Sequence, residues 1–285
     1  MNRCVVIIPV YSVSPTDSEK ASFRNTLSVL RMHDITVVTY RNCNTKEYDN
    51  ICNNLNTSIK YEYFNEEYFA SVHGYNDLCF SKSFYLRFAE YEYMLICQLD
   101  AWVFRDELNY WCDKNYDYIG APIFYGYSSN RFSKKIMGIG NGGLSLRKIS
   151  HALKITSAQK KRIFLKPKTI ISIYLNTALT NEEFRKSTLR MIVLPFLIMA
   201  KCLGFHNTLN YYIRKHLNED LVFGSWSTDA WGIKANIPVA DEAIRFSFEV
   251  HPNFLFNKTN HQLPFGCHAF LKWEYDSFWC KHIKY

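Results

Sequence analysis

The segment 91–104 constrains the fold more than any other stretch, because a buried strand in it ends in polar residues. Residues 94–97 form an apolar run without Gly or Pro, which is typical of a strand buried on both faces of a parallel sheet. Gln98 and Asp100 follow two residues apart, so in an extended chain their side chains point to the same side. Ligands of open α/β sheets bind beyond the carboxyl ends of the strands, where a carboxylate can hold a divalent cation and that cation a diphosphate. The alternative is an ordinary surface aspartate at a strand end.

Strands and helices alternate through the first part of the chain. Short apolar or β-branched runs predict strands, and apolar residues at helical spacing predict the helices between them. The predicted strands cover residues 5–10, 35–40 and 59–64, and the predicted helices cover 18–32, 48–55, 76–88 and 108–111. Residues 118–122 are predicted to turn. The alternation indicates a parallel sheet with crossover helices.

The composition is that of a globular chain rich in aromatic residues. The 285 residues, 48% hydrophobic and 21% charged, can form one large domain or two small ones. Aromatic side chains, 16% of the total, supply core volume and can also stack on bases and sugar rings. Nine cysteines without CxxC or zinc-like spacing indicate reduced core thiols in a cytosolic protein. The apolar run at 5–10 is too short for a signal peptide.

Positive charge is concentrated in one region of the sequence. The net charge is +8, and no acidic residue lies between Asp117 and Glu182. The basic residues in that interval are Arg131, Lys134, Lys135, Arg147, Lys148, Lys154, Lys160, Lys161, Arg162, Lys166 and Lys168. Such a zone attracts phosphates, anionic lipid or nucleic acid, and a merely solvated basic face is the alternative.

Residues 149–216, called the insertion below, differ in character from the rest. They are first basic and then strongly apolar, with Pro167 and Pro195 as breakers, and they predict a helical insertion. The run 191–200 is about half as long as a transmembrane helix and is flanked by Arg185, Lys186, Arg190 and Lys201. It is either a buried core helix or an anchor at an anionic membrane surface.

Two further segments carry polar or glycine-rich patterns. Residues 138–143, called the glycine loop below, contain four Gly in six positions, so backbone must approach something closely there or simply turn tightly. The loop has neither the P-loop pattern nor the dinucleotide-binding spacing. Glu219 and Asp220 form an acidic pair, which can serve as a general base or merely occupy the first turn of a helix.

Several segments, in order, resemble a bacterial family of glycosyltransferases with the GT-A fold, of the type that builds polysaccharides and other glycans. They are residues 7–10, 98–100, 118–122, 140–147, 218–220 and 264–270. The resemblance implies one α/β domain: GT-A-like, with a Rossmann-like, mostly parallel central sheet, flanking helices and a helical insertion. Residues 1–148 would bind the nucleotide sugar, 149–216 form the insertion, and 217–285 supply acceptor and catalytic groups.

The resemblance also implies a reaction: transfer of a hexose from a nucleotide sugar, most simply a UDP-sugar, to a hydroxyl of a glycan or lipid-linked glycan. A divalent metal would bridge the diphosphate, Mn²⁺ rather than Mg²⁺ because a His is among the ligands. The family's DxD motif has Gln98 in its first position if Asp100 is the second, or Trp102 in its second if Asp100 is the first. We adopt the former, with Asp100 and His268 as metal ligands.

The remaining site residues follow from the same resemblance and from position in the fold. Asp220, or Glu219 beside it, would be the base of an inverting reaction, on a strand-to-helix turn. Tyr11 would stack on the base, Arg41 or Asn42 would contact it, and Lys82 would reach the phosphates. Pro9, Val10, Tyr11, Arg41, Lys82, Gln98 and Asp100 are thus the expected donor-binding residues, and Asn141, Gly142 and Gly143 the acceptor-binding ones.

Two alternatives stay open. A non-catalytic nucleotide- or sugar-binding protein could have kept the fold with a degraded metal site. A nucleic-acid-binding protein could use the basic zone, but no recognised nucleic-acid motif supports it, so no nucleic-acid partner is expected. The expected location is cytoplasmic, with peripheral contact to the inner face of the cell membrane if 191–200 is an anchor.

Overall fold

The computed structural model describes residues 2–11, 13–126, 133–158, 163–180, 186–224 and 230–285. Of the basic residues named above, Arg131, Lys160, Lys161, Arg162 and Arg185 lie outside them.

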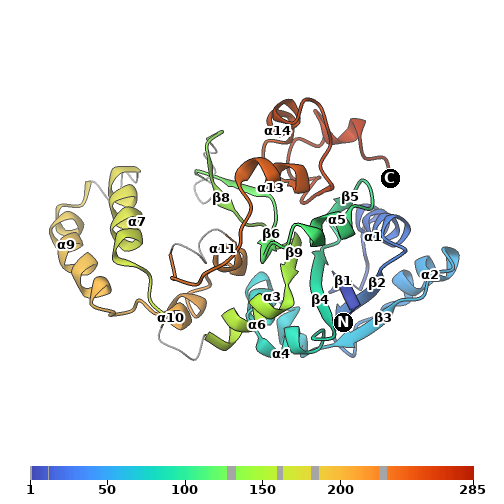
Figure 1. The fold of residues 1–285 in the computed structure, drawn as a ribbon, viewed down its shortest axis with the longest axis horizontal. Helices are drawn as coiled ribbons and strands as arrows, with labels where there is room; N and C mark the ends of the chain where they lie inside the picture. Colours follow the sequence, from blue (N-terminus) through green and yellow to red (C-terminus); the bar gives the residue numbers. More distant parts are fainter. Residues whose placement is uncertain (1, 12, 127–132, 159–162, 181–185, 225–229) are drawn as a thin grey trace.

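A six-stranded sheet forms the centre of the molecule, with strand order β3-β2-β1-β4-β9-β6 (Figure 1). Its strands are β1 (Asn2–Pro9), β2 (Asp34–Thr39), β3 (Lys60–Tyr63), β4 (Tyr91–Cys97), β6 (Tyr118–Ile119) and β9 (Leu144–Lys148). The first four strands in chain order pair with one another in parallel, and β9 runs antiparallel to both β4 and β6. The predicted fold class, an α/β fold with a mostly parallel central sheet, is confirmed.

Strand β1 shows why this sheet needs helices on both faces. Val5 and Ile7 point into one hydrophobic core, whereas Val6 and Ile8 point into another, and all four are buried. Successive side chains of a strand point to opposite faces, so a continuous β-branched run requires cover on both sides.

Helices from different parts of the chain cover the two faces. One face carries α1 (Asp17–Val29), α2 (Lys46–Asn54) and α5 (Leu108–Asp113), and the other carries α3 (Val72–Cys79), α4 (Lys82–Leu86) and α6 (Ile149–Ala158). Thr16 and Glu19 form a capping box at the start of α1. The single helix predicted for 76–88 is wrong: Ser81 adopts an extended conformation between α3 and α4. The turn predicted for 118–122 falls between two short strands, β6 and β7.

Two smaller sheets and the remaining short elements complete the half of the molecule that contains the site. The sheet β10-β11-β5 consists of β10 (Ser247–Phe248), β11 (Gly266–Cys267) and β5 (Trp102–Val103). The other sheet pairs β7 (Pro122–Phe124) with β8 (Ile136–Ile139). The helices nearby are α11 (Glu219–Phe223), α13 (Ala240–Phe246), α14 (Pro252–Lys258), η1 (Glu66–Tyr68) and η3 (Trp279–Lys281). All nine cysteines are free, and six of them are buried.

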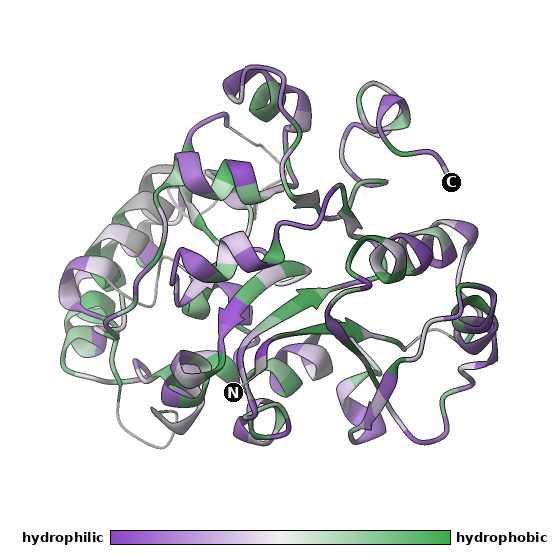
Figure 2. Ribbon diagram, turned by 45° about the vertical axis from the view of Figure 1, so that its right-hand side comes forward, coloured by the Kyte–Doolittle hydropathy of each residue, from purple (hydrophilic) through white to green (hydrophobic). Residues whose placement is uncertain are grey.

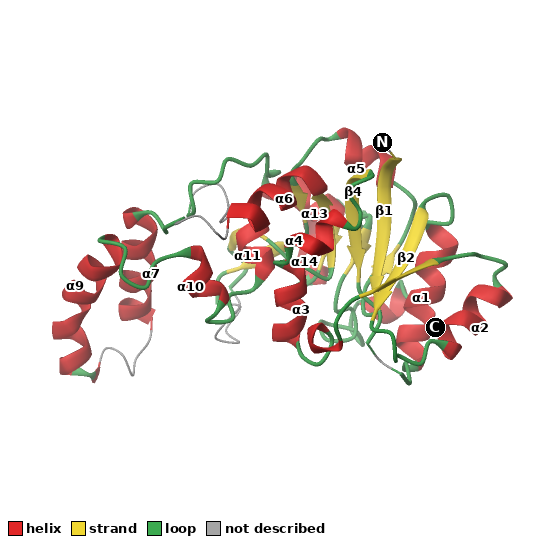
Figure 3. Ribbon diagram, turned by 90° about the horizontal axis from the view of Figure 1, so that it is seen from below, coloured by secondary structure: helices red, strands yellow, loops and turns green. Residues whose placement is uncertain are grey.

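The insertion is helical, as predicted; its first helix covers the sheet, and its later helices extend away from it. It contains α6, α7 (Pro167–Thr180), α9 (Thr188–Cys202) and α10 (Leu209–Ile213). Helices α7 and α9 pack against each other at the far left of Figures 1 and 3. No helix in the described part of the chain is long and apolar enough to cross a membrane. The alternative of a buried core helix at 191–200 is wrong, because Leu194 and Lys201 are the only fully buried side chains among those described on α9.

Candidate active site

Three strands bring polar side chains to one end of the sheet β10-β11-β5. Strands β10 and β11 are parallel, and β5 is antiparallel to β11, so the ends of β10 and β11 lie beside the start of β5. Glu249 follows β10 directly, His268 follows β11 directly, and Asp100 lies two residues before β5. Since Asp100 also follows β4, this end of the small sheet adjoins the carboxyl end of the central sheet.

Gln98, Asp100, Glu249 and His268, called the His268 cluster below, surround one imidazole. Atom Nε2 of His268 lies 3.1 Å from Oδ1 of Asp100 and 3.2 Å from Oε1 of Gln98. Atom Nδ1 lies 3.5 Å from Oε1 of Glu249. Gln98 and Asp100 therefore do point to the same place, but through a turn in which Ala101 N–H donates to Gln98 O at 3.0 Å, not through an extended chain.

The charges in the His268 cluster stabilise one another. Burial lowers the pKa of His268, but its ion pairs with Asp100 and Glu249 outweigh burial and raise that pKa to about 10. Burial also raises the pKa of Asp100, and the charge and hydrogen bond of His268 outweigh that effect, so this pKa is lowered. At neutral pH the imidazole is a cation beside a half-exposed carboxylate.

The donor set of the His268 cluster fits a divalent cation that is bound together with a diphosphate. Asp100, Gln98 and His268 direct an anionic oxygen, an amide oxygen and a ring nitrogen to one point. Glu249 lies behind the other ring nitrogen, the arrangement that orients metal-binding His side chains. Within the described ranges, no three His, Cys, Asp or Glu side chains form a complete metal site. Further ligands would therefore come from the diphosphate and water, and His268 would have to lose its proton.

The loop predicted for 138–143 is shorter than expected, because its first two residues end β8; its remaining residues, 140–143, pack directly against this cluster. A Cβ on Gly143 would lie 2.0 Å from Nε2 of His268, and one on Gly142 would lie 2.3 Å from Oε1 of Glu219. No side chain fits at these distances, so the close approach predicted from the sequence is an approach to the protein's own catalytic candidates. Gln98 N–H also donates to Gly143 O at 2.8 Å, which ties the loop to the end of β4.

Asp220 contacts the same loop from the other side. Its Oδ2 accepts a hydrogen bond from Asn141 N–H at 2.8 Å, while its Oδ1 is buried and has no hydrogen-bond partner among the residues that the structure describes. Burial and the neighbouring charge of Glu219 raise the pKa of Asp220 to about 7. A carboxylate with that pKa can accept a proton near neutral pH.

Glu219 has a different environment from Asp220. Its Oε1 lies 2.7 Å from Nη2 of Arg147, and both side chains are enclosed. Arg147 also donates to Tyr85 and stacks over Phe223, 5.2 Å from the ring centroid. The expected strand-to-helix turn is wrong, because the acidic pair opens α11 after the helical insertion. Arg147 likewise belongs to no exposed basic face.

The other expected donor-binding residues do not all lie at the carboxyl end of the central sheet. Pro9 and Val10 are buried at the end of β1, where Val10 N–H donates to Val38 O. Tyr11 follows, about half exposed, and burial together with the charge of Asp100 raises its pKa, so it lies near the His268 cluster. Lys82 is exposed on α4, which leads into the start of β4, whereas the cluster follows the end of that strand.

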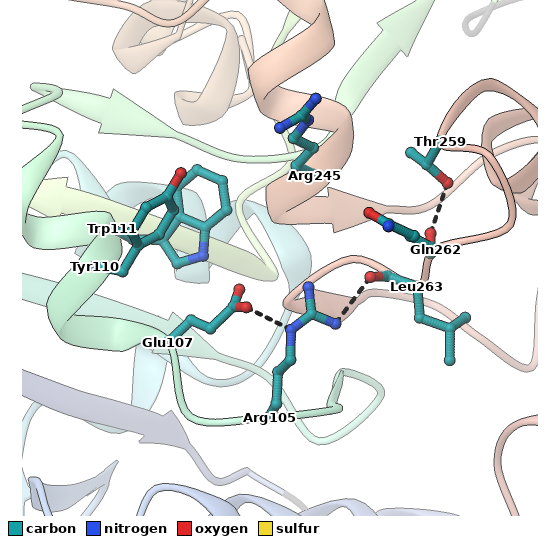
Figure 4. Close-up of a pocket in the computed structure, with 8 residues that line it drawn as sticks. All are labelled: Arg105, Glu107, Tyr110, Trp111, Arg245, Thr259, Gln262 and Leu263. Carbon is teal, nitrogen blue, oxygen red and sulfur yellow. Dashed lines mark hydrogen bonds and ion pairs between the residues drawn. The ribbon is translucent and has the colours of Figure 1, made fainter.

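Two cavities lie outside the His268 cluster. Arg41 and Asn42 line one of about 420 Å³ beyond β2 and β3, where Arg41 also lies over the ring of Tyr63. The other, of about 180 Å³, is shown in Figure 4 with Arg105 and Arg245 directed toward it. Arg105 is held there by Glu107 and by Leu263 O at 2.9 Å. This second cavity adjoins the opposite end of the sheet β10-β11-β5, since its residues follow β5 and precede β10 and β11.

Sequence reasoning gave no role to Glu249, Arg147 or Tyr85. Glu249 ends the alternating run 246–249, and that pattern would have placed it at a strand end. Arg147 lies in the segment 140–147, one of those that resemble the glycosyltransferase family, but no local sequence pattern indicates that its side chain is buried. Asn141, expected at the acceptor, has positive φ (68°) and accepts from Tyr118 through its backbone carbonyl, so it shapes the loop.

Comparisons with known proteins give a family and distant structural likenesses. Residues 58–268 match the family described as "Protein of unknown function (DUF5672)". No curated protein matches the chain. A glycosyltransferase involved in glycosylation of the major capsid of PBCV-1 is 11% identical, with 96% of each chain covered and a TM-score of 0.34. Core-mannan synthase A from Aspergillus fumigatus, in a Mn/GDP form, is 10% identical over 78% of this chain and 72% of that one, with a TM-score of 0.37. Likeness at this level carries no argument about activity.

Proposed function

The chain belongs to the DUF5672 family of proteins of unknown function, and from the geometry around His268 and Asp220 we propose that it is a glycosyltransferase. The observation that carries the proposal is the glycine loop, which touches His268 with Gly143 and Asp220 with Asn141. A cationic and a basic group thus meet beside one backbone segment at the carboxyl end of the sheet, where open α/β folds bind ligands.

In the proposed reaction, the acceptor hydroxyl attacks the anomeric carbon of a hexose on a nucleotide sugar, most simply a UDP-sugar. The bond from that carbon to the diphosphate breaks, and the electron pair leaves with the diphosphate. Asp220 takes the hydroxyl proton through Oδ1, which accepts no hydrogen bond from the described residues, and the attack inverts the anomeric centre. The active site would be of the GT-A type, and its acceptor would be a hydroxyl of a glycan or of a lipid-linked glycan.

Other residues would bind and orient the donor. Asp100 and His268 would hold a divalent cation, Mn²⁺ in preference to Mg²⁺, which would neutralise charge on the leaving diphosphate. Gln98 would orient the imidazole through its amide oxygen, 3.2 Å away. Tyr11, half exposed beside Asp100, would stack on the base or sugar. Glu219 is neutralised by Arg147, so between the two acids Asp220 is the proposed base.

The test is release of UDP from UDP-hexoses, with and without Mn²⁺ and simple sugar acceptors. Asp220→Asn keeps the shape and removes the proton acceptor, so turnover should fall by about two to four orders of magnitude with donor affinity nearly unchanged. Asp241→Asn, at an exposed position on α13, is the matched control and should retain the wild-type rate. If Asp220→Asn keeps the wild-type rate, Asp220 is not the base.

A second candidate function is a non-catalytic binder of nucleotide or sugar. It is favoured by one observation: the predicted metal position offers a single carboxylate, Asp100, which is already paired with a protonated His268. Binding of UDP or UDP-hexose measured by calorimetry, without any release of UDP over hours, would favour this alternative over the transferase.

A further inference from the structure

Helix α9 exposes an extended apolar surface. Leu189, Phe196 and Leu203 are 72%, 64% and 82% exposed, and their spacing of seven residues places them on one face of the helix. Other exposed apolar residues on and after this helix are Ile192, Val193, Leu197, Met199 and Phe205. The hydrophobic colouring of these helices is visible at the left of Figure 2. A soluble monomer seldom exposes so many large apolar side chains together.

The insertion also carries the positive charge of the protein. Residues 149–216 contain twelve Lys and Arg and two acidic residues, a net charge of +10. The whole chain has +8, so the remaining residues together carry −2. Arg190, one turn into α9, is exposed beside the apolar surface. Positive charge and exposed apolar area thus fall in the same segment of the chain.

This combination selects among the possible occupants of the surface. A second copy of the chain would bring two insertions of net charge +10 together, which is unfavourable. An anionic bilayer can bury the apolar side chains at the boundary of its acyl chains, and its negative headgroups attract the cations. Helix α9, with 15 residues, is too short to span the bilayer, so it would lie in the interface plane.

We propose that α9 and the turn after it dock the protein on an anionic membrane surface. Leu189, Phe196 and Leu203 enter the boundary between headgroups and acyl chains, and Arg190 contacts the headgroups. The inference rests on the exposed surface and its charge, and it holds whether or not the His268 cluster transfers sugars.

The experiment is flotation of the full chain with two kinds of vesicle: phosphatidylcholine alone, and phosphatidylcholine mixed with phosphatidylglycerol. Wild type should float with the anionic vesicles at low salt and dissociate as salt is added. The triple variant Leu189→Ser, Phe196→Ser, Leu203→Ser should bind by about two orders of magnitude more weakly, because three apolar side chains no longer enter the membrane. Arg190→Glu should weaken binding by about fivefold or more at low salt.

Matched controls carry the same changes elsewhere on the surface. Met32→Ser, Val72→Ser and Val239→Ser alter residues that are 80%, 74% and 69% exposed, and Arg31→Glu reverses an exposed charge near α1. These variants should float as wild type does, and circular dichroism should show all variants folded. The proposal is overturned if wild type ignores anionic vesicles at low salt, or if the controls weaken binding equally. It is also overturned if sedimentation shows a dimer that the triple variant disrupts while vesicle binding is absent.

Discussion

Glu219 and Arg147 form an ion pair of 2.7 Å that is closed off from solvent beneath the glycine loop. Gly142 lies so close that any side chain there would collide with Glu219. The next residue, Asp220, faces the same loop, where Asn141 N–H donates to it, and burial with the charge of Glu219 raises its pKa to about 7. Two consecutive acidic residues thus have different partners: Glu219 pairs with a buried cation, whereas Asp220 accepts from a backbone N–H.

The buried pair predicts a large loss of stability when one partner is removed. Arg147→Met should lower the free energy of unfolding by about 3–5 kcal/mol, because the charge of Glu219 remains buried and unpaired. Adding Glu219→Leu should recover much of that loss, since no buried charge then remains. Denaturant unfolding measures both. Arg3→Met, which removes a partner from the exposed pair with Asp113, is the control and should cost less than about 1 kcal/mol. Equal losses for Arg147→Met and Arg3→Met would contradict the argument.

Asp220 predicts an unusual dependence of stability on pH. Its pKa is about 7 in the folded protein against an ordinary 3.8, so between these values the folded state holds a proton that the unfolded state has released. The contribution of Asp220 to stability therefore falls as pH rises from 4 to 7, and the full penalty applies above 7. Asp220→Asn removes the penalty, so the variant should be more stable than wild type by on the order of 2 kcal/mol at pH 8, and by less at pH 5.

Chemical unfolding at the two pH values checks this prediction. Asp241→Asn should show no such difference, because that carboxylate is exposed. A variant Asp220→Asn that is less stable than wild type at pH 8 would mean that the carboxylate is compensated in the folded protein by something other than Asn141 N–H.

The central strand could be predicted from the sequence, because an apolar run followed by Gln98 and Asp100 depends on local pattern alone. The break between α3 and α4 could not. Phe80 and Phe84 continue the apolar period across it, and both are buried in one core with Tyr85 and Phe223, so packing decides where the helix ends.

The site was predictable only in part, for a physical reason. His268 and Gln98 are 170 residues apart in sequence, and Arg147 and Glu219 are 72 apart. Motif order placed His268 beside Asp100, but no pattern in the sequence indicates which acid neutralises a buried arginine. The glycines correctly predicted that the backbone lies close to other groups. Which side chains it lies against depends on the tertiary fold and could not be predicted.

Gly143 predicts how the loop controls His268. Gly143→Ala would put a methyl group 2.0 Å from Nε2, so the imidazole must move away from Asp100. Without that partner, the pKa of His268 should fall from about 10 toward its ordinary 6.5, as an NMR titration of the ring would show. Gly142→Ala is the matched control: its methyl group meets Glu219, so it should reduce stability and leave the pKa of His268 high. A high pKa in both variants would mean that the ring tolerates the methyl group.

Asp100 and His268 predict the behaviour of metal and donor together. If both are ligands, wild type should be stabilised by Mn²⁺ plus UDP, with a rise in Tm of roughly 5 °C or more at concentrations far above Kd. Asp100→Ala or His268→Ala should abolish the part of this rise that needs Mn²⁺. Glu249→Gln should keep it but require about 10- to 100-fold more Mn²⁺, because the imidazole loses the carboxylate that orients it. Asp113→Ala, at an exposed surface pair, is the control and should leave the rise unchanged. A Mn²⁺-dependent rise that survives in both Asp100→Ala and His268→Ala would place the cation elsewhere.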